Sequence, residues 1–87
     1  MEDKIWYLYI LECGDGSLYT GITDDVPRRL AQHSAGKGAK YTRGRGPLLL
    51  RYQEECGTHV DALRREIQIK RLTRQEKLKL ITVGAGH

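Results

Sequence analysis

The 87-residue sequence has only two cysteines, Cys13 and Cys56, and they form no CxxC pair and no cluster with histidine. This excludes the usual zinc-binding spacings and a disulfide framework, so both thiols are expected to be reduced packing residues. Long apolar runs are also missing, because the stretch at 5–11 is too short for a membrane span or a secretion signal. We therefore expect a cytoplasmic protein that does not enter a membrane.

No internal repeat, linker or low-complexity segment marks a second domain. A chain of this length buries only a modest core, so an open surface site is expected rather than a large enclosed pocket. The prediction is one domain over residues 1–87, with a core over about 4–82 and a frayed tail at 83–87.

Acidic residues are absent from one basic segment. Residues 37–51 hold five Lys and Arg and no acid, residues 67–87 hold five against Glu76 alone, and the net charge is +4. Clustered cations attract polyanions, so nucleic acid is the leading expected partner, and solubility alone is the other reading of this charge. The glycines of "GKGAKYTRG" fit neither a P-loop nor a dinucleotide-binding loop.

The residue pattern predicts the order β-β-α-loop-β-α-α. Residues 5–11 are apolar on both alternating faces, and "CGDGS" then turns the chain into a second strand at 18–23. Pro27 suits the first turn of a helix that runs to about Ser34, with Asp24 or Asp25 as its cap. A basic, Gly-rich loop with room for a helical turn at "GAKYT" leads to a third strand, "LLLRYQEE".

Two helices follow, each begun by a capping box, in "THVD" and "TRQE", and the first should end near Leu72. This order predicts an α+β fold in which a small three-stranded antiparallel sheet, made of an N-terminal hairpin and one later strand, packs with three to four helices.

The length of the first turn decides where two tyrosines lie. A two-residue turn would pair Tyr9 with Ile22 and place Tyr9 and Tyr19 on opposite faces of the sheet. A three-residue "GDG" loop pairs Tyr9 with Gly21 and Leu11 with Tyr19, which puts both phenols on one face. We predict the three-residue loop, in which Gly21 leaves space opposite Tyr9 for a ligand's backbone.

Two polar residues flank the apolar stripe of the first helix. Arg29 and His33 lie one turn apart and point the same way, so they should lie over the sheet edge near Tyr19. The alternative is that Arg29 extends along the surface to water and that His33 is an ordinary residue at the boundary of the stripe.

An acid lies within the apolar arc of the next helix. On a helical wheel Glu66 falls among Ala62, Leu63, Ile67 and Ile69, whereas the opposite, wet face carries Asp61, Arg64, Arg65, Gln68 and Arg71. A buried carboxylate needs a partner. One reading is an ion pair with Lys70 at i,i+4, and the other is a single-carboxylate site for a hard divalent ion such as Mg²⁺.

With these residues in view, the chain resembles the GIY-YIG nuclease superfamily, specifically its small stand-alone members. "YLY" at 7–9 and "YTG" at 19–21 stand where the family has its two tripeptides, Arg29 comes ten residues after Tyr19, and His33 comes four residues later. The family's metal-binding glutamate matches Glu66 in "ALRREI". The chain departs from the pattern in having Tyr7 where the first tripeptide has glycine, and in having no asparagine at all.

The resemblance implies phosphodiester hydrolysis with one divalent ion, Mg²⁺ or Mn²⁺, as cofactor. Glu66 would hold the metal, Arg29 would stabilise charge on the phosphoryl group, and a phenol of Tyr9 or Tyr19 would orient or deprotonate the attacking water, with His33 as a hydrogen-bond partner. Arg28 and Arg29 would supply the cations that such a phenol needs to act as a base. Which tyrosine is the base stays open.

The expected function is a metal-dependent DNA endonuclease of low sequence specificity in repair or recombination, acting on branched, nicked or single-stranded DNA and directed by DNA shape or a targeting protein. Phosphate contacts are expected from Arg28, Lys37, Lys40, Arg43, Arg45 and Lys70. One alternative is a nucleic-acid-binding module that cleaves little without a partner protein. Another is a protein-interaction domain whose basic surface serves solubility.

Overall fold

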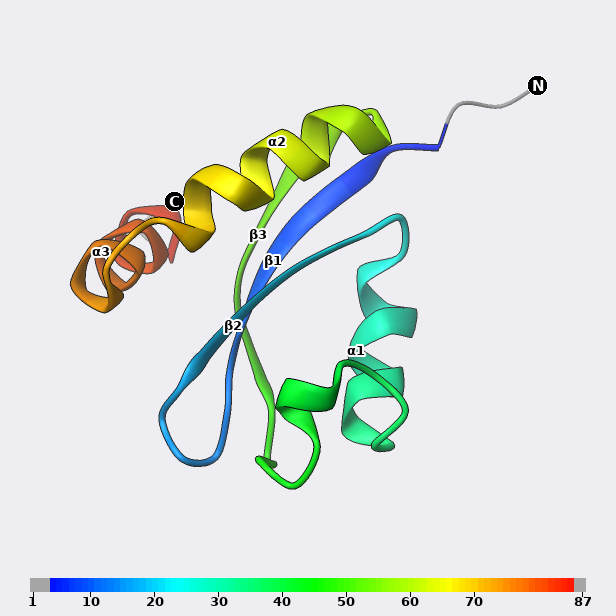
Figure 1. The fold of residues 1–87 in the computed structure, drawn as a ribbon, viewed down its shortest axis with the longest axis vertical. Helices are drawn as coiled ribbons and strands as arrows, with labels where there is room; N and C mark the ends of the chain where they lie inside the picture. Colours follow the sequence, from blue (N-terminus) through cyan, green and yellow to red (C-terminus); the bar gives the residue numbers. More distant parts are fainter. Residues whose placement is uncertain (1–3, 86–87) are drawn as a thin grey trace.

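The computed structural model describes residues 4–85 (Figure 1). Within this range the strands are β1 (Trp6–Glu12), β2 (Leu18–Thr23) and β3 (Leu49–Gly57), and the α-helices are α1 (Val26–Ser34), α2 (His59–Lys70) and α3 (Arg74–Ala85). A 3-10 helix, η1 (Lys40–Thr42), forms in the basic loop. The sheet is antiparallel with the order β2-β1-β3, which confirms the predicted α+β fold with its N-terminal hairpin.

The central strand, β1, is buried on both of its faces, as its apolar pattern predicted. On one face Leu8 and Ile10 are fully buried and pack with Ile69 of α2 and Ile81 of α3. On the other face Tyr9 is 2% exposed and contacts α1. In Figure 1, α2 runs along the sheet toward α3, whereas α1 lies apart from both, beside η1. The sheet therefore separates the apolar core from the side chains that surround Tyr9.

The register of the hairpin is the one that the three-residue loop predicts. Tyr9 pairs with Gly21, and Leu11 pairs with Tyr19, so both tyrosines lie on the face that α1 covers. The predicted space opposite Tyr9 is not open to a ligand, because the phenol of Tyr9 itself fills it. A Cβ atom added to Gly21 would lie 2.6 Å from Cζ of the Tyr9 ring and still closer to its hydroxyl. Since β2 is an edge strand, the ring crosses it at Gly21 and brings its hydroxyl toward the sheet edge.

Each α-helix begins at a cap that the sequence predicted. The Asp25 side chain accepts a hydrogen bond from the backbone of Arg28 and so caps α1. Thr58 and Asp61 form the capping box of α2, and the "TRQE" box begins α3 through reciprocal bonds of 2.8 and 3.2 Å. Helix α2 ends at Lys70, two residues before its predicted end.

Residues 83–85, which the sequence predicted to fray, continue α3 instead. The helix can extend this far because its start is capped and Ile81, only 6% exposed, anchors it in the core. The predicted fraying of residues 86–87 lies outside the described residues. No helix of residues 4–85 has both the length and the apolar character needed to cross a membrane. Both cysteines are free, and Cys13 is buried, as expected for packing residues.

Helix α2 faces the sheet differently from its predicted orientation. Ala62 and Ile69 are buried, but Leu63 and Ile67 are 39% and 53% exposed, although the wheel placed all four in the buried arc. The half-buried Arg65, predicted on the wet face, forms a two-pronged ion pair with Glu54 of β3, with N···O distances of 2.8 and 3.1 Å. Because Ala62 and Ile69 face the sheet, Arg65 and Glu66 lie on either side of the buried face of α2, at its margins.

Candidate active site

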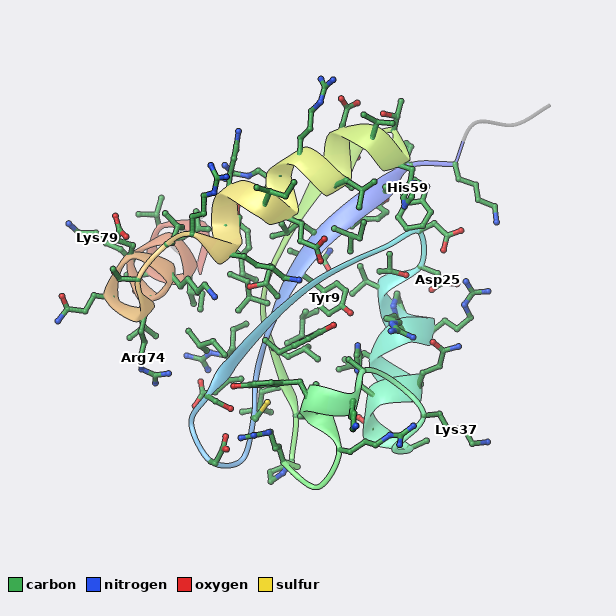
Figure 2. The ribbon with its side chains drawn as sticks, viewed as in Figure 1. Tyr9, Asp25, Lys37, His59, Arg74 and Lys79 are labelled. Atoms are coloured by element: carbon green, nitrogen blue, oxygen red, sulfur yellow. The ribbon has the colours of Figure 1, made fainter. Side chains whose placement is uncertain are left out.

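The centre of the candidate site is a buried hydrogen bond between β1 and α1. The Tyr9 hydroxyl lies 2.8 Å from Nε2 of His33, and both side chains are only 2% exposed. Val26 and His33 are the buried residues of α1, and because they are seven positions apart they share the face that meets the sheet. The reading of His33 as a boundary residue of the stripe is therefore wrong. Figure 2 shows Tyr9 in the middle of the molecule, directed from β1 toward α1.

Burial controls the protonation of this pair. It raises the pKa of Tyr9 to about 12, and the guanidinium of Arg29 opposes this rise through hydrogen bonding and charge. Burial, followed by the positive charge of Arg29, lowers the pKa of His33. The imidazole is therefore neutral at pH 7, and the phenol stays protonated unless further positive charge comes close.

Arg29 lies beside this pair, and its positive charge is available to a ligand. Its Nη1 donates to Oε1 of Gln32, one turn along α1, at 3.0 Å. None of the ion pairs formed within residues 4–85 involves Arg29. A guanidinium that no carboxylate neutralises is suited to a phosphate, whose oxygens match its planar set of donors.

Tyr19 belongs to the same group of rings but makes different contacts. Its ring centroid is 5.5 Å from that of His33 and 5.7 Å from that of Tyr41 of η1, on which it stacks. The guanidinium of Arg45 lies over the ring of Tyr41, 4.4 Å from its centroid. No hydrogen bond formed within residues 4–85 involves the Tyr19 hydroxyl, so Tyr9 is the phenol with a defined partner.

Glu66 lies on α2, half-buried at the margin of the face that packs on the sheet. Its negative charge is the smallest of the causes that change the pKa of Tyr9. Oε2 of Glu66 also pairs with Nζ of Lys70 at 3.2 Å, and the two side chains are 19% and 53% exposed. The structure thus contains the predicted ion pair, and the role of Glu66 as a metal ligand stays a prediction.

The donor set suits a hard divalent cation with few protein ligands. Within residues 4–85 no group of three or more His, Cys, Asp or Glu is placed to hold a metal ion. The ion pair engages Oε2 of Glu66, while no hydrogen bond among these residues engages Oε1. Mg²⁺ commonly binds through one or two carboxylates, with waters and substrate phosphate oxygens completing its shell. Glu66 therefore fits such a role.

The other predicted cations lie around this centre rather than in it. Arg28 is directed to Asp24 and Asp25, at 3.2 and 4.0 Å, whereas Arg29 is the cation that lowers the pKa of Tyr9. Arg45 forms an ion pair with Asp15, which lies in the turn between β1 and β2. The side chains of Lys37, Lys40 and Arg43 are exposed on the loop around η1.

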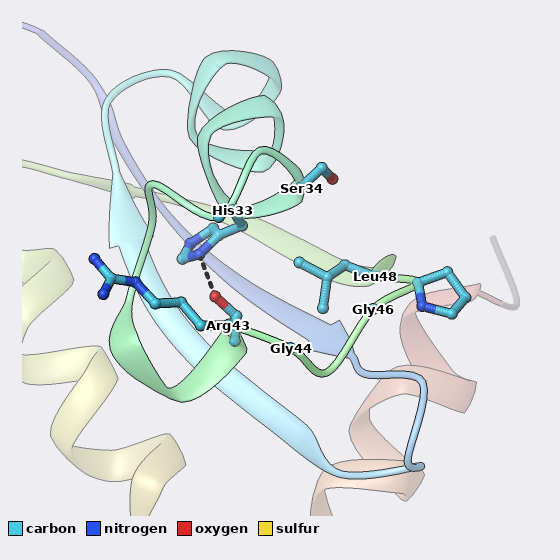
Figure 3. Close-up of a pocket in the computed structure, with 9 residues that line it drawn as sticks. His33, Ser34, Arg43, Gly44, Gly46 and Leu48 are labelled. Atoms are coloured by element: carbon cyan, nitrogen blue, oxygen red, sulfur yellow. Dashed lines mark hydrogen bonds between the residues drawn. The ribbon is translucent and has the colours of Figure 1, made fainter.

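Sequence reasoning missed the groups behind His33. Thr42 of η1 is 2% exposed, and its Oγ1 lies 3.0 Å from Nδ1 of His33, a contact drawn as a dashed line in Figure 3. The backbone N–H of Ala39 donates to the same nitrogen at 3.2 Å. A cavity of about 320 Å³ lies beside these residues, lined by Arg43 and loop glycines. The only sequence signal was the small residues around "GAKYT", and nothing in it showed that the loop folds back onto α1.

The chain is similar to known proteins. Residues 5–79 match the model of the GIY-YIG catalytic domain, a nuclease-type domain that acts on nucleic acid. A UPF0213 protein of Yersinia pestis (strain Pestoides F) is 53% identical over 81 residues, which cover 93% of this chain and 85% of that protein. A UPF0213 protein of Yersinia pseudotuberculosis (strain YPIII) shows the same identity and coverage.

Two solution NMR structures are similar as well. A UPF0213 protein from Bacillus halodurans is 49% identical with a TM-score of 0.59, and the match covers 91% of this chain and 84% of that one. A protein from E. faecalis is 40% identical with a TM-score of 0.63, and the match covers 100% of this chain and 95% of that one. The matched domain and these relatives show that the chain belongs to the GIY-YIG family, among its small UPF0213 members.

Proposed function

We propose that this protein is a divalent-metal-dependent DNA endonuclease that hydrolyses phosphodiester bonds with low sequence specificity. The observation that carries the proposal is the environment of the Tyr9 hydroxyl. It is bonded to His33 and is acted on by both Arg29 and Glu66, although these residues come from β1, α1 and α2. A phenol, an imidazole, a guanidinium and a carboxylate gathered at a sheet edge are the groups that this hydrolysis needs.

In the proposed reaction Tyr9 is the general base. The oxygen of a water molecule bonds to phosphorus, and one proton of that water passes to the phenolate of Tyr9. The bond from phosphorus to the leaving oxygen breaks with its electron pair on that oxygen, which takes up a proton from solvent. Arg29 stabilises the negative charge that develops on the phosphoryl oxygens. A divalent ion held by Glu66, Mg²⁺ or Mn²⁺, would add positive charge that stabilises the same oxygens and lowers the pKa of Tyr9.

Tyr9 is the better base because its oxygen is held in place. His33 fixes the direction of its hydroxyl, and Arg29 provides a nearby cation. The Tyr19 ring instead supports Tyr41 and contacts the edge of His33. We assign Tyr19 a packing role that keeps the imidazole and the loop in position.

DNA structure, or a partner protein, selects where cleavage occurs. The cations around the site are lysines and arginines, which contact phosphates and carry no base information. We propose branched, nicked or single-stranded DNA as substrate and a role in repair or recombination, in the cytoplasm. Contacts to flanking phosphates come from the exposed loop cations, with smaller contributions from Arg28, Arg45 and Lys70, whose charges are shared with acids.

A second candidate function is favoured by one observation. With a pKa of about 12, Tyr9 is almost entirely protonated near neutral pH. A protein in this state binds nucleic acid but cleaves it slowly until a partner or a metal changes the site. Purified protein that binds DNA but cleaves no form of it, with Mg²⁺ or Mn²⁺ present, would support this reading over the first.

Cleavage assays with Arg29→Ala test the proposed enzyme. We expect purified protein to cleave supercoiled, branched or single-stranded DNA with Mg²⁺ or Mn²⁺, and Arg29→Ala to slow cleavage by about 100- to 1,000-fold, because one stabilising donor is lost. The matched control is Arg64→Ala, since Arg64 is exposed on α2. Single-turnover rates give the comparison, and circular dichroism checks the fold. Equal rates for the two variants would exclude Arg29 from the chemistry.

Charge reversal in the loop around η1 tests the DNA contact surface. The variant Lys37→Glu/Lys40→Glu/Arg43→Glu should bind DNA more weakly and show a shallower salt dependence, because each lost phosphate contact reduces the slope of log K against log salt by about 0.9. A control with the same change in net charge is Arg71→Glu/Arg74→Glu/Lys79→Glu. Titrations between about 50 and 200 mM salt provide the slopes. If both variants lose the same affinity, net charge rather than the loop governs binding.

A further inference from the structure

The loop between α1 and β3 encloses the side of His33 that faces away from Tyr9. Gly38 lies so close that an added Cβ would be 2.6 Å from Cγ of the imidazole. Thr42 is buried against the same ring, and Figure 3 shows the loop passing around His33. The imidazole is thus held between Tyr9 on one side and the loop on the other.

Thr42 lies between Ala39 and His33. Its backbone N–H donates to the Ala39 carbonyl at 3.1 Å. Its hydroxyl has one hydrogen and two acceptors within reach, the same carbonyl oxygen at 2.8 Å and Nδ1 of His33 at 3.0 Å. With its carbonyl held in this way, Ala39 directs its own N–H at Nδ1 of His33, 3.2 Å away. When Nδ1 presents a lone pair, the Thr42 hydroxyl donates its hydrogen there, because two lone pairs facing each other at 3.0 Å would repel. When Nδ1 carries the proton, the hydroxyl accepts from the ring and donates to the Ala39 carbonyl instead.

The bond from Ala39 is the contact that distinguishes the two tautomers of the ring. A backbone N–H can only donate, so the Nδ1 that receives the bond from Ala39 must present a lone pair. Because the neutral imidazole has one N–H, the proton is then on Nε2, which faces the Tyr9 oxygen at 2.8 Å. Nε2–H donates to that oxygen, and the phenol keeps its own hydrogen for another acceptor.

We propose that Thr42 and the Ala39 N–H are the positioning groups of this site and fix His33 as the Nε2–H tautomer. In this tautomer the oxygen of Tyr9 receives a hydrogen bond, which favours its deprotonated form. In the opposite tautomer a bare Nε2 would accept the phenol's hydrogen, and Tyr9 would be a donor to His33 rather than a base. The catalytic consequence rests on the proposed function, whereas the tautomer itself does not.

The tautomer is measured directly by ¹⁵N NMR of the imidazole rings in the full-length protein at a pH where His33 is neutral. In the wild type we expect His33 to show an unprotonated Nδ1 and a protonated Nε2. Thr42→Val removes the hydroxyl at similar size, so its two nitrogen shifts should move toward each other as both tautomers become populated. Thr42→Ser restores the hydroxyl and should keep the wild-type shifts. Thr82→Val is the control, because the Thr82 hydroxyl bonds only to Leu78 within α3.

Cleavage rates add the catalytic readout. Thr42→Val should lower kcat by roughly 10- to 100-fold, the usual cost of losing a group that orients a site residue, with KM unchanged, and Thr42→Ser should recover most of it. A protonated Nδ1 in the wild type, or unchanged His33 shifts in Thr42→Val, would overturn the proposal. If Thr42→Val does not fold, the wild-type and Thr42→Ser spectra still decide it. A wild type without nuclease activity would contradict the proposed function but leave the NMR result intact.

Discussion

Replacing Glu66 with glutamine should nearly abolish cleavage while changing stability very little. Glutamine keeps the size of the side chain and removes its charge, so a divalent ion loses its protein ligand. Metal ions contribute several kcal/mol to charge stabilisation in such reactions, so we expect a loss of at least about 100-fold in single-turnover rate. The ion pair with the half-exposed Lys70 is worth at most about 0.5 kcal/mol, so thermal unfolding should shift only slightly.

A matched variant separates this result from the general effect of removing one negative charge. Glu55→Gln makes the same chemical change at an exposed position of β3 and should cleave like the wild type. Binding of Mn²⁺, followed by the EPR signal of the free ion, should weaken in Glu66→Gln and not in Glu55→Gln. Cleavage that persists in Glu66→Gln at the wild-type rate would mean that the Glu66–Lys70 pair has only a structural role or that a contaminating nuclease is present.

Tyr9→Phe should reduce cleavage by about 100- to 10,000-fold, the usual contribution of a general base. It removes the oxygen that accepts the proton and leaves the ring in place. The variant should also lose about 1–3 kcal/mol of stability, because Nε2 of the buried His33 loses its partner. Denaturant titration measures this cost. Tyr19→Phe, the matched variant, should lose far less activity, because its ring contacts are retained. A larger loss in Tyr19→Phe would reverse the assignment of the base.

The pH dependence of the wild-type cleavage rate also tests the assignment of Tyr9 as the general base. Burial raises the pKa of Tyr9 to about 12, so the phenolate fraction increases about tenfold per pH unit below that value. The logarithm of the rate should therefore rise with pH through the neutral and mildly alkaline range. Tyr9→Phe should lose this slope. A variant with the wild-type slope would show that another group, such as the attacking water itself, sets the profile.

The sequence predicted the parts of the structure that local rules determine. The length of the first turn gave the pairing of Tyr9 with Gly21, and a cap or capping box marked the start of each helix. Spacing along α1 placed His33 near the phenols. The resemblance to a known family, and not the helical wheel, favoured a metal-binding role for Glu66, because the wheel alone left an ion pair as an equal alternative.

The remaining features depend on contacts between segments that are distant along the chain. A wheel defines the arcs of a helix but not which arc meets the sheet. In α2 that arc is centred on Ala62 and Ile69, so Arg65 can reach Glu54 of β3 while Leu63 and Ile67 are exposed. In the same way, no local pattern shows that the loop around η1 folds back and brings Thr42 against His33.

The crossing of β2 by the Tyr9 ring makes the two tripeptides one steric unit. The ring can lie there only because position 21 has no side chain, so "YLY" and "YTG" are two halves of a single fitted contact. The two positions should therefore vary together among relatives. A relative with a larger residue at position 21 has to shorten the side chain at position 9 or move its base elsewhere.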